Sequence, residues 1–137
     1  MNAIDTNVLV YRLDGSEPIK QAIARRLIRR LAAQGDTVLH WQVAGEFLRQ
    51  LSAWRDQGHL SQNRVLRLSH SVRQLFPLHL PMESSLDRAV HYAHTYMLSH
   101  WDSMLVAACA DAGVTTLYTE DMGAPRKIDT VELVNPF

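Results

Sequence analysis

The stretch TVLHWQVAGEFLRQLSAWRDQG, residues 37–58, decides the fold class, because two kinds of secondary structure follow each other within it. Its first part, TVLHW, is rich in β-branched and aromatic side chains and predicts a short strand. The remainder predicts a helix because apolar side chains recur at intervals of three or four residues, namely Val43, Phe47, Leu51 and Trp54. A strand that runs directly into an amphipathic helix is the repeating unit of an α/β protein.

The same alternation continues along the chain. Short apolar runs predict strands at 2–5, 115–119 and 131–137. Helical periodicity predicts helices over 16–35, 61–75 and 84–98, and a further helix that begins near Asp102. Because the chain has no repeat and no linker-like segment, the prediction is one α/β domain over residues 1–137, with a central, mostly parallel sheet flanked by helices.

Composition excludes some classes of protein. The 137 residues have 47% hydrophobic content, and 14 basic residues balance 14 acidic ones, so a polyanion binder acting through net charge is not indicated. No apolar run is long enough to cross a membrane, and the N-terminus does not resemble a signal peptide. The single cysteine, Cys109, lies in an apolar helical pattern and predicts a buried, inert thiol. We therefore expect a cytoplasmic protein without membrane contact.

Four acidic residues stand at unusual places in this scheme. In SHWDSMLVAACADAG, residues 99–113, Asp102 shares a helical stripe with apolar side chains, and the simplest interpretation is a helix cap. Asp5 and Asp121 follow predicted strands and would serve equally well in turns. Glu46 flanks the apolar face of the helix after residue 41, where a solvated side chain is the ordinary expectation.

Considered together, the four acids favour one shared site over four separate structural roles. The carboxyl ends of parallel strands meet at one edge of a sheet, which is where ligands bind in open α/β folds. Carboxylates converging there would suit a hard divalent cation such as Mg²⁺. Asp102 would then be a metal ligand that also caps its helix.

Four segments carry a family resemblance: AIDTNVLVY, the Glu in QVAGEFLRQL, WDSMLVAACADAG and TTLYTEDM. In their order and spacing, the sequence resembles the PIN-domain ribonucleases, especially the VapC-type toxins of bacterial toxin–antitoxin systems. The resemblance implies a PIN-like domain over the whole chain and an endoribonuclease that hydrolyses RNA phosphodiester bonds with Mg²⁺ or Mn²⁺. The cation would activate a water and stabilise the leaving oxygen, which leaves a 5′-phosphate.

Residue roles follow from the same resemblance. The catalytic acids and metal ligands would be Asp5, Glu46, Asp102 and Asp121. Thr119 corresponds to a supporting hydroxyl, and Asn7 would assist from behind the ligands. Glu120 adjoins Asp121, but at the end of a strand its side chain should point the other way. The segment MGAPRKIDT, residues 122–130, is expected to be a loop.

Partners are also implied. VapC-type toxins are typically homodimers, and a cognate antitoxin covers the acidic centre with its C-terminal segment. RNA is the expected substrate. Arginine suits phosphate contacts, and residues 57–82 contain no acid. The candidate RNA-binding residues are Arg25, Arg26, Arg29, Arg30, Arg64, Arg67 and Arg73.

Other classes of function fit the sequence less well. A receiver domain would leave Glu46 unexplained, and a phosphatase of the Asp-x-Asp type would need an acid where Asn7 stands. His91 and His94 lack further ligands at zinc-binding spacing. The serious alternative is a non-catalytic PIN-like module that binds RNA or a protein partner.

Overall fold

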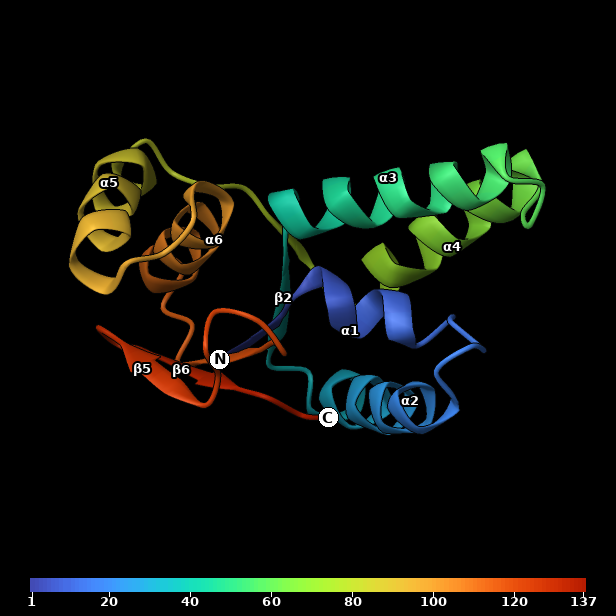
Figure 1. The fold of residues 1–137 in the computed structure, drawn as a ribbon, viewed down its shortest axis with the longest axis horizontal. Helices are drawn as coiled ribbons and strands as arrows, with labels where there is room; N and C mark the ends of the chain where they lie inside the picture. The colour runs from blue at the N-terminus through green and yellow to red at the C-terminus, as the bar shows by residue number, and fades with distance from the viewer.

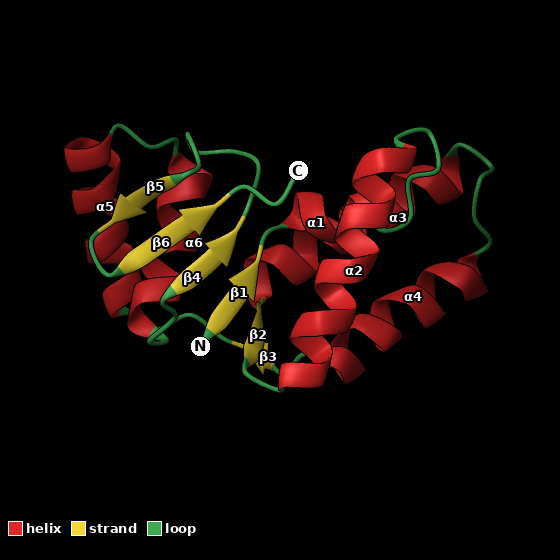
Figure 2. Ribbon diagram, turned by 90° about the horizontal axis from the view of Figure 1, so that it is seen from below, coloured by secondary structure: helices red, strands yellow, loops and turns green.

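The computed structural model describes residues 1–137 as one sheet with helices around it (Figures 1 and 2). The strands are β1 (Asn2–Ile4), β2 (Thr37–His40), β3 (Leu78–His79), β4 (Thr116–Tyr118), β5 (Arg126–Ile128) and β6 (Val131–Val134). The helices are α1 (Thr6–Tyr11), α2 (Pro18–Gln34), α3 (Trp41–Asp56), α4 (Gln62–Leu75), α5 (Ser84–Tyr96) and α6 (His100–Asp111).

The six strands form one sheet in the order β3-β2-β1-β4-β6-β5. All neighbouring pairs are parallel except β5 and β6, so the predicted mostly parallel α/β sheet is confirmed. Two of its edge strands were not predicted. Segment 122–130 is not entirely a loop, because it contains β5, and β3 lies in the Pro-bounded run 76–81. Strands of two and three residues are too short to show an alternating pattern.

Helices lie on both sides of the sheet, with α5 and α6 on one side and α2 on the other (Figure 2). Residues 105–109 of α6 are all buried because α5 packs on the outer side of this helix. On α2 the buried residues are Ala24, Leu27, Ile28 and Leu31, whereas Ile19, an apolar residue in the first turn, is exposed. None of the helices combines the length and apolar character that crossing a membrane requires.

The helices α3 and α4 form a pair that extends away from the sheet (Figure 1). The predicted apolar face of α3 is buried at Val43, Phe47 and Leu51. Trp41, which the sequence pattern placed in a strand, is instead the first residue of α3. The carboxyl end of β2 therefore leads without a loop into α3, and this places Glu46 close to that edge of the sheet.

Two histidines meet inside the sheet, at the paired ends of β2 and β3. The His40 side chain is 1% exposed, and its ring centroid lies 5.3 Å from that of His79. Neither ring nitrogen of His40 has a hydrogen-bond partner. Burial, with a smaller contribution from His79, lowers the pKa of His40 from 6.5 to about 4.

This lowered pKa predicts that His40 destabilises the fold in mild acid. Because the unfolded chain takes up the His40 proton first, the contribution of His40 to the free energy of unfolding should fall as the pH drops from 6.5 to about 4. The lost contribution amounts to roughly 3 kcal/mol when complete. Urea unfolding at several pH values should therefore show His40→Leu gaining stability relative to wild type as the pH drops, whereas the exposed-site control His94→Gln should show no such gain. An equal pH dependence in wild type and His40→Leu would contradict a buried, neutral His40.

Candidate active site

The carboxyl ends of β1 and β4 bring Asp5 and Asp121 to the same edge of the sheet. The two strands pair in parallel, with Ile4 opposite Tyr118. The amide of Asp5 continues this pairing, since it donates to the carbonyl of Tyr118 at 2.9 Å. Asp121 follows three residues after Tyr118. The two acids therefore come together from positions 116 residues apart because of the strand order alone.

Asp5 is the most enclosed of the four acids, with only 7% of its surface exposed. The Thr119 hydroxyl donates to its Oδ2 at 2.7 Å, and the Thr6 amide donates to its Oδ1 at 2.6 Å. The second contact makes Asp5 the N-cap of the short helix α1. The turn-cap interpretation is therefore correct for Asp5, but a cap alone does not need a buried carboxylate held on both oxygens.

Burial raises the pKa of Asp5 from 3.8 to about 6. Hydrogen bonds from Thr119 and Thr6 oppose this shift, while the charges of Glu46 and Asp121 add to it. Two further acids therefore lie near enough to act on Asp5 electrostatically. The dominant cause of the raised pKa is nevertheless the loss of water around Asp5 rather than repulsion between carboxylates.

Asn7 joins Asp5 to Asp121. Its amide nitrogen donates to Asp121 Oδ2 at 3.1 Å and lies 3.4 Å from Asp5 Oδ2. The Asn7 Oδ1 atom is buried and has no partner. Thr119 completes the connection, since its hydroxyl accepts from the Asp121 amide at 3.0 Å while donating to Asp5. Asn7 and Thr119 thus contact both aspartates, and the supporting roles that the family resemblance implies for them stay predictions.

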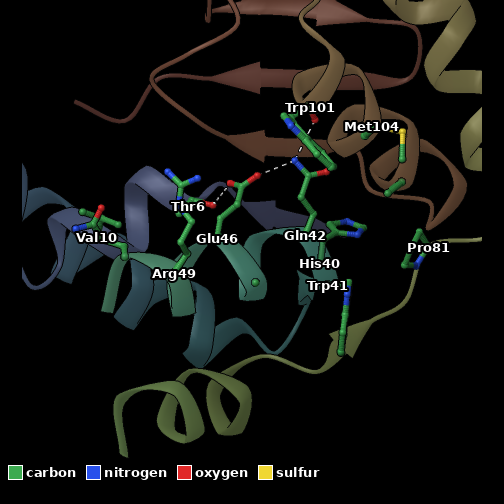
Figure 3. A pocket seen from close by; sticks show the side chains of 13 residues that line it. Thr6, Val10, His40, Trp41, Gln42, Glu46, Arg49, Pro81, Trp101 and Met104 are labelled. Carbon is green, nitrogen blue, oxygen red and sulfur yellow. Dashed lines mark hydrogen bonds between the residues drawn. The ribbon is translucent and has the colours of Figure 1, made fainter. Parts of the chain in front are cut away.

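Glu46 reaches the same edge from α3 (Figure 3). Its Oε2 accepts from the Thr6 hydroxyl at 2.6 Å, and its Oε1 accepts from the Gln42 amide at 2.9 Å. Gln42 also donates to the carbonyl of Trp101 at 3.0 Å, which ties α3 to the first turn of α6. Sequence reasoning missed Thr6 and Gln42. The signal for Gln42 was its spacing of four residues from Glu46, which puts both on one face of the helix.

Asp102 lies in the first turn of α6, but it is not the cap of that helix. The cap is Ser99, whose hydroxyl accepts from the Asp102 amide at 3.3 Å. The prediction that Asp102 caps the helix is therefore wrong. Its half-buried carboxylate makes no hydrogen bond or salt bridge, and the hydrogen bond that links α6 to the residues around Glu46 is made by the Trp101 carbonyl.

The four acids do not form a closed set of metal ligands. No group of three or more His, Cys, Asp or Glu side chains stands close enough together to hold a metal ion. The donor chemistry nevertheless fits an oxygen-seeking divalent cation, because carboxylates gather at the edge and the buried Asn7 Oδ1 lacks a partner. The salt bridges of the chain include none of the four acids. None of them is therefore paired directly with a basic side chain.

Other residues singled out in the sequence lie outside this arrangement. Glu120 points away from the acids, as expected, and accepts from Tyr11 and Lys20, each at 2.6 Å. Cys109 is buried, and burial raises the pKa of its thiol. His91 and His94 are both exposed on α5.

The candidate RNA-binding arginines are all exposed, and they stand on two helices, α2 and α4. Arg25 and Arg29 line a hollow of about 370 Å³ together with Arg12 and with Leu75 at the end of α4. Arg12 was missed, because nothing in its sequence context shows that α1 ends beside α2. Arg64 stands at the opposite end of α4, about 16 Å from Leu75 at the rise of an α-helix.

Comparison with known proteins agrees with the fold. The sequence profile of the PIN domain matches residues 3–129. This α/β chain, with acids at the carboxyl edge of its sheet, belongs to the PIN domain family. No curated protein sequence matches the chain.

Solved structures share the whole fold at low sequence identity. A toxin–antitoxin complex from Klebsiella pneumoniae is 14% identical, with a TM-score of 0.72, over 100% of this chain and 98% of that one. VapBC2 from Rickettsia felis, bound to a DNA fragment from its promoter, is 12% identical, with a TM-score of 0.71, over 96% of each chain. Mycobacterium tuberculosis VapC20, a toxin that cleaves the sarcin-ricin loop, is 16% identical, with a TM-score of 0.64, over 94% of this chain and 98% of that one.

Proposed function

We propose that this PIN domain is a metal-dependent endoribonuclease and the toxin of a VapBC-type toxin–antitoxin pair. The observation that carries the proposal is the buried Asp5 carboxylate, linked to Asp121 through Thr119 and Asn7 and lying near Glu46, with no salt bridge from a basic side chain to any of these acids. Burying a charged carboxylate costs free energy. A fold that gathers three acids without a salt bridge is suited to bind a cation.

The residues of the candidate active site would have two kinds of role, binding the cation and orienting the acids that bind it. Asp5, Glu46, Asp102 and Asp121 would hold Mg²⁺ or Mn²⁺, and the bound ion would activate a water and stabilise charge on the phosphate. Thr119 fixes the orientation of Asp5, and Asn7 keeps Asp121 beside it. Thr6 and Gln42 each hold one oxygen of Glu46. These hydrogen bonds restrict the rotamers of the acids, so that less ordering remains when the ion and the RNA bind.

The solved structures support the biological setting of the proposal. Several of them are toxin–antitoxin complexes, and VapC20 cleaves the sarcin-ricin loop of RNA. A cognate antitoxin that places an Arg or Lys over these acids would silence the enzyme. We further propose that the chain acts as a homodimer in the cytoplasm.

One observation favours a second candidate, a PIN-like module that binds RNA or a partner without cleaving it. The acids do not form a closed ligand set, and Asp102 contacts none of the others. In this alternative the acidic edge would be a docking site for a basic segment. The two candidates differ in whether RNA is cut.

A cleavage assay separates them. Purified chain is incubated with labelled RNAs, including hairpins with exposed loops, in Mn²⁺, Mg²⁺ or EDTA. The nuclease proposal requires cleavage with a divalent cation, none in EDTA, and 5′-phosphate ends on the products. Binding without cleavage under every metal condition would support the non-catalytic module instead.

The hollow lined by Arg25 and Arg29 gives a prediction about substrate binding. If both guanidinium groups contact phosphates, Arg25→Glu and Arg29→Glu should each weaken RNA binding and lower the slope of log affinity against log salt by about one unit. Titrations at several salt concentrations measure this slope. Lys127→Glu, which reverses an exposed charge on the edge strand β5, is the control. Equal slopes in all the proteins would mean that these arginines are only a solvated surface.

A further inference from the structure

A groove of about 670 Å³ opens beside Glu46, between the first turns of α3 and α6 (Figure 3). Glu46 and Thr6 line the groove and also belong to the candidate active site. The groove is therefore continuous with the acidic edge. Its volume is in the range of pockets that hold a small molecule or a similar fragment of a larger ligand.

Two exposed tryptophans mark this groove. Trp41 at the start of α3 is 57% exposed, and Trp101 at the start of α6 is 62% exposed. The chain has three tryptophans, and the third, Trp54, packs against the core. Trp41 has no aromatic neighbour, while Trp101 contacts only the ring of His100, at 4.8 Å. The two indoles do not pack on each other, so aromatic surface remains free on both.

The groove also contains a free positive charge. Arg49, one turn after Glu46 on α3, lines the groove and is exposed. Its guanidinium forms no salt bridge or hydrogen bond, whereas Arg55 further along the same helix pairs with Asp56. An unpaired guanidinium near an acidic centre is suited to an anionic group of a ligand.

We propose that the groove binds an unpaired nucleobase adjacent to the cleaved phosphate, with Trp41 and Trp101 as stacking surfaces and Arg49 on a neighbouring phosphate. This inference rests on the proposed function. A nucleotide carries a flat base and an anion one sugar apart, which matches indole surface and guanidinium in one groove. Unpaired RNA bases commonly stack on aromatic side chains. A peptide does not combine a flat ring with a phosphate charge in this way.

Binding in EDTA tests the groove separately from cleavage. The probes are a short single-stranded RNA of mixed sequence and a ribose-phosphate oligomer of the same length without bases. RNA should quench tryptophan fluorescence and bind about tenfold or more tightly than the abasic oligomer, because a stacked base contributes about that factor. Trp41→Ala and Trp101→Ala should each lose about tenfold in RNA affinity. Trp41→Phe and Trp101→Phe should retain most of it.

The control variant is Val90→Ala, which removes an exposed apolar side chain from α5, outside the groove. It should bind both probes like wild type. Equal affinity for RNA and for the abasic oligomer, or unchanged RNA binding in both alanine variants, would overturn the inference. So would quenching by a synthetic peptide rich in Leu and Arg but not by RNA, because the groove would then be a peptide site.

Cleavage in Mn²⁺ distinguishes this failure from failure of the proposed function. RNA cleavage by wild type that is undiminished in Trp41→Ala and Trp101→Ala would overturn the base-binding groove and leave the nuclease proposal intact. Base-dependent quenching in EDTA without cleavage under any metal condition would support the groove and contradict the nuclease proposal.

Discussion

Replacing Asp5 with Asn is expected to abolish RNA cleavage and at the same time to make the metal-free protein more stable. Asn keeps the shape of Asp and can still accept from the Thr6 amide, but it removes the buried charge. Losing a ligand of a catalytic cation costs several kcal/mol of transition-state stabilisation, which is about 10³-fold in rate. The expected rise in stability comes from the raised pKa of Asp5.

The sign of the stability change follows from that pKa. Since the folded-state pKa of Asp5 is about 6 and its ordinary value is 3.8, the folded protein holds the proton more tightly. Ionisation of Asp5 therefore lowers the free energy of unfolding of the metal-free wild type as the pH rises from 3.8 to about 6, by at most about 3 kcal/mol. Asp5→Asn lacks this loss, so at neutral pH it should melt several degrees higher in EDTA.

Thermal melts with and without Mn²⁺ complete the test. Wild type should gain stability as Mn²⁺ is added, because the ion binds the folded state, and Asp5→Asn should gain less. Asp56→Asn, which changes an exposed acid on α3, is the control and should behave as wild type in every assay. An Asp5→Asn protein that melts like wild type in EDTA and still cuts RNA would mean that Asp5 only caps α1.

Much of the site could be predicted because strand ends are visible in the sequence. Asp5 follows AI and Asp121 follows TLYTE, and the parallel arrangement of their strands puts both acids at one edge. Thr119 was assigned from the family resemblance, and the structure places its hydroxyl against Asp5 and the amide of Asp121. Glu46 was placed by the helix that starts directly after β2.

The parts that sequence reasoning missed depend on contacts between distant segments. Trp41 and Trp101 belong to helices that meet only in the folded chain, so neither indole drew attention in the sequence. Arg12 approaches Arg25 for the same reason. The arginines on α2 and α4 were grouped by composition, but composition carries no information about which end of a helix lies near its neighbour.

The N-cap of α6 was predicted wrongly for a different reason. Ser and Asp are both favoured N-cap residues, and SHWD offers each of them within one turn, so residue preference alone does not decide. The backbone decides, since Ser99 has the extended conformation of an N-cap and Asp102 lies inside the helix. This difference frees the Asp102 carboxylate from the cap and makes its role testable.

Ser99→Ala and Asp102→Asn are therefore expected to have opposite effects. Ser99→Ala removes the cap and should lower the free energy of unfolding by about 1 kcal/mol while leaving cleavage nearly intact. Asp102→Asn leaves the Ser99 cap in place and loses only the favourable position of an acid in the first turn, roughly 0.3–1 kcal/mol at most. It should nevertheless lower the cleavage rate by several hundredfold or more, if Asp102 holds the catalytic cation.

The matched control is Asp87→Asn, because Asp87 occupies the first turn of α5 as Asp102 does that of α6, away from the acids. Urea unfolding in EDTA and RNA cleavage in Mn²⁺ are measured on the three variants and wild type. Asp87→Asn should match Asp102→Asn in stability and wild type in cleavage. If Asp102→Asn also cuts RNA at the wild-type rate, Asp102 is a first-turn acid with no part in catalysis. Any metal site would then rest on Asp5, Glu46 and Asp121 alone.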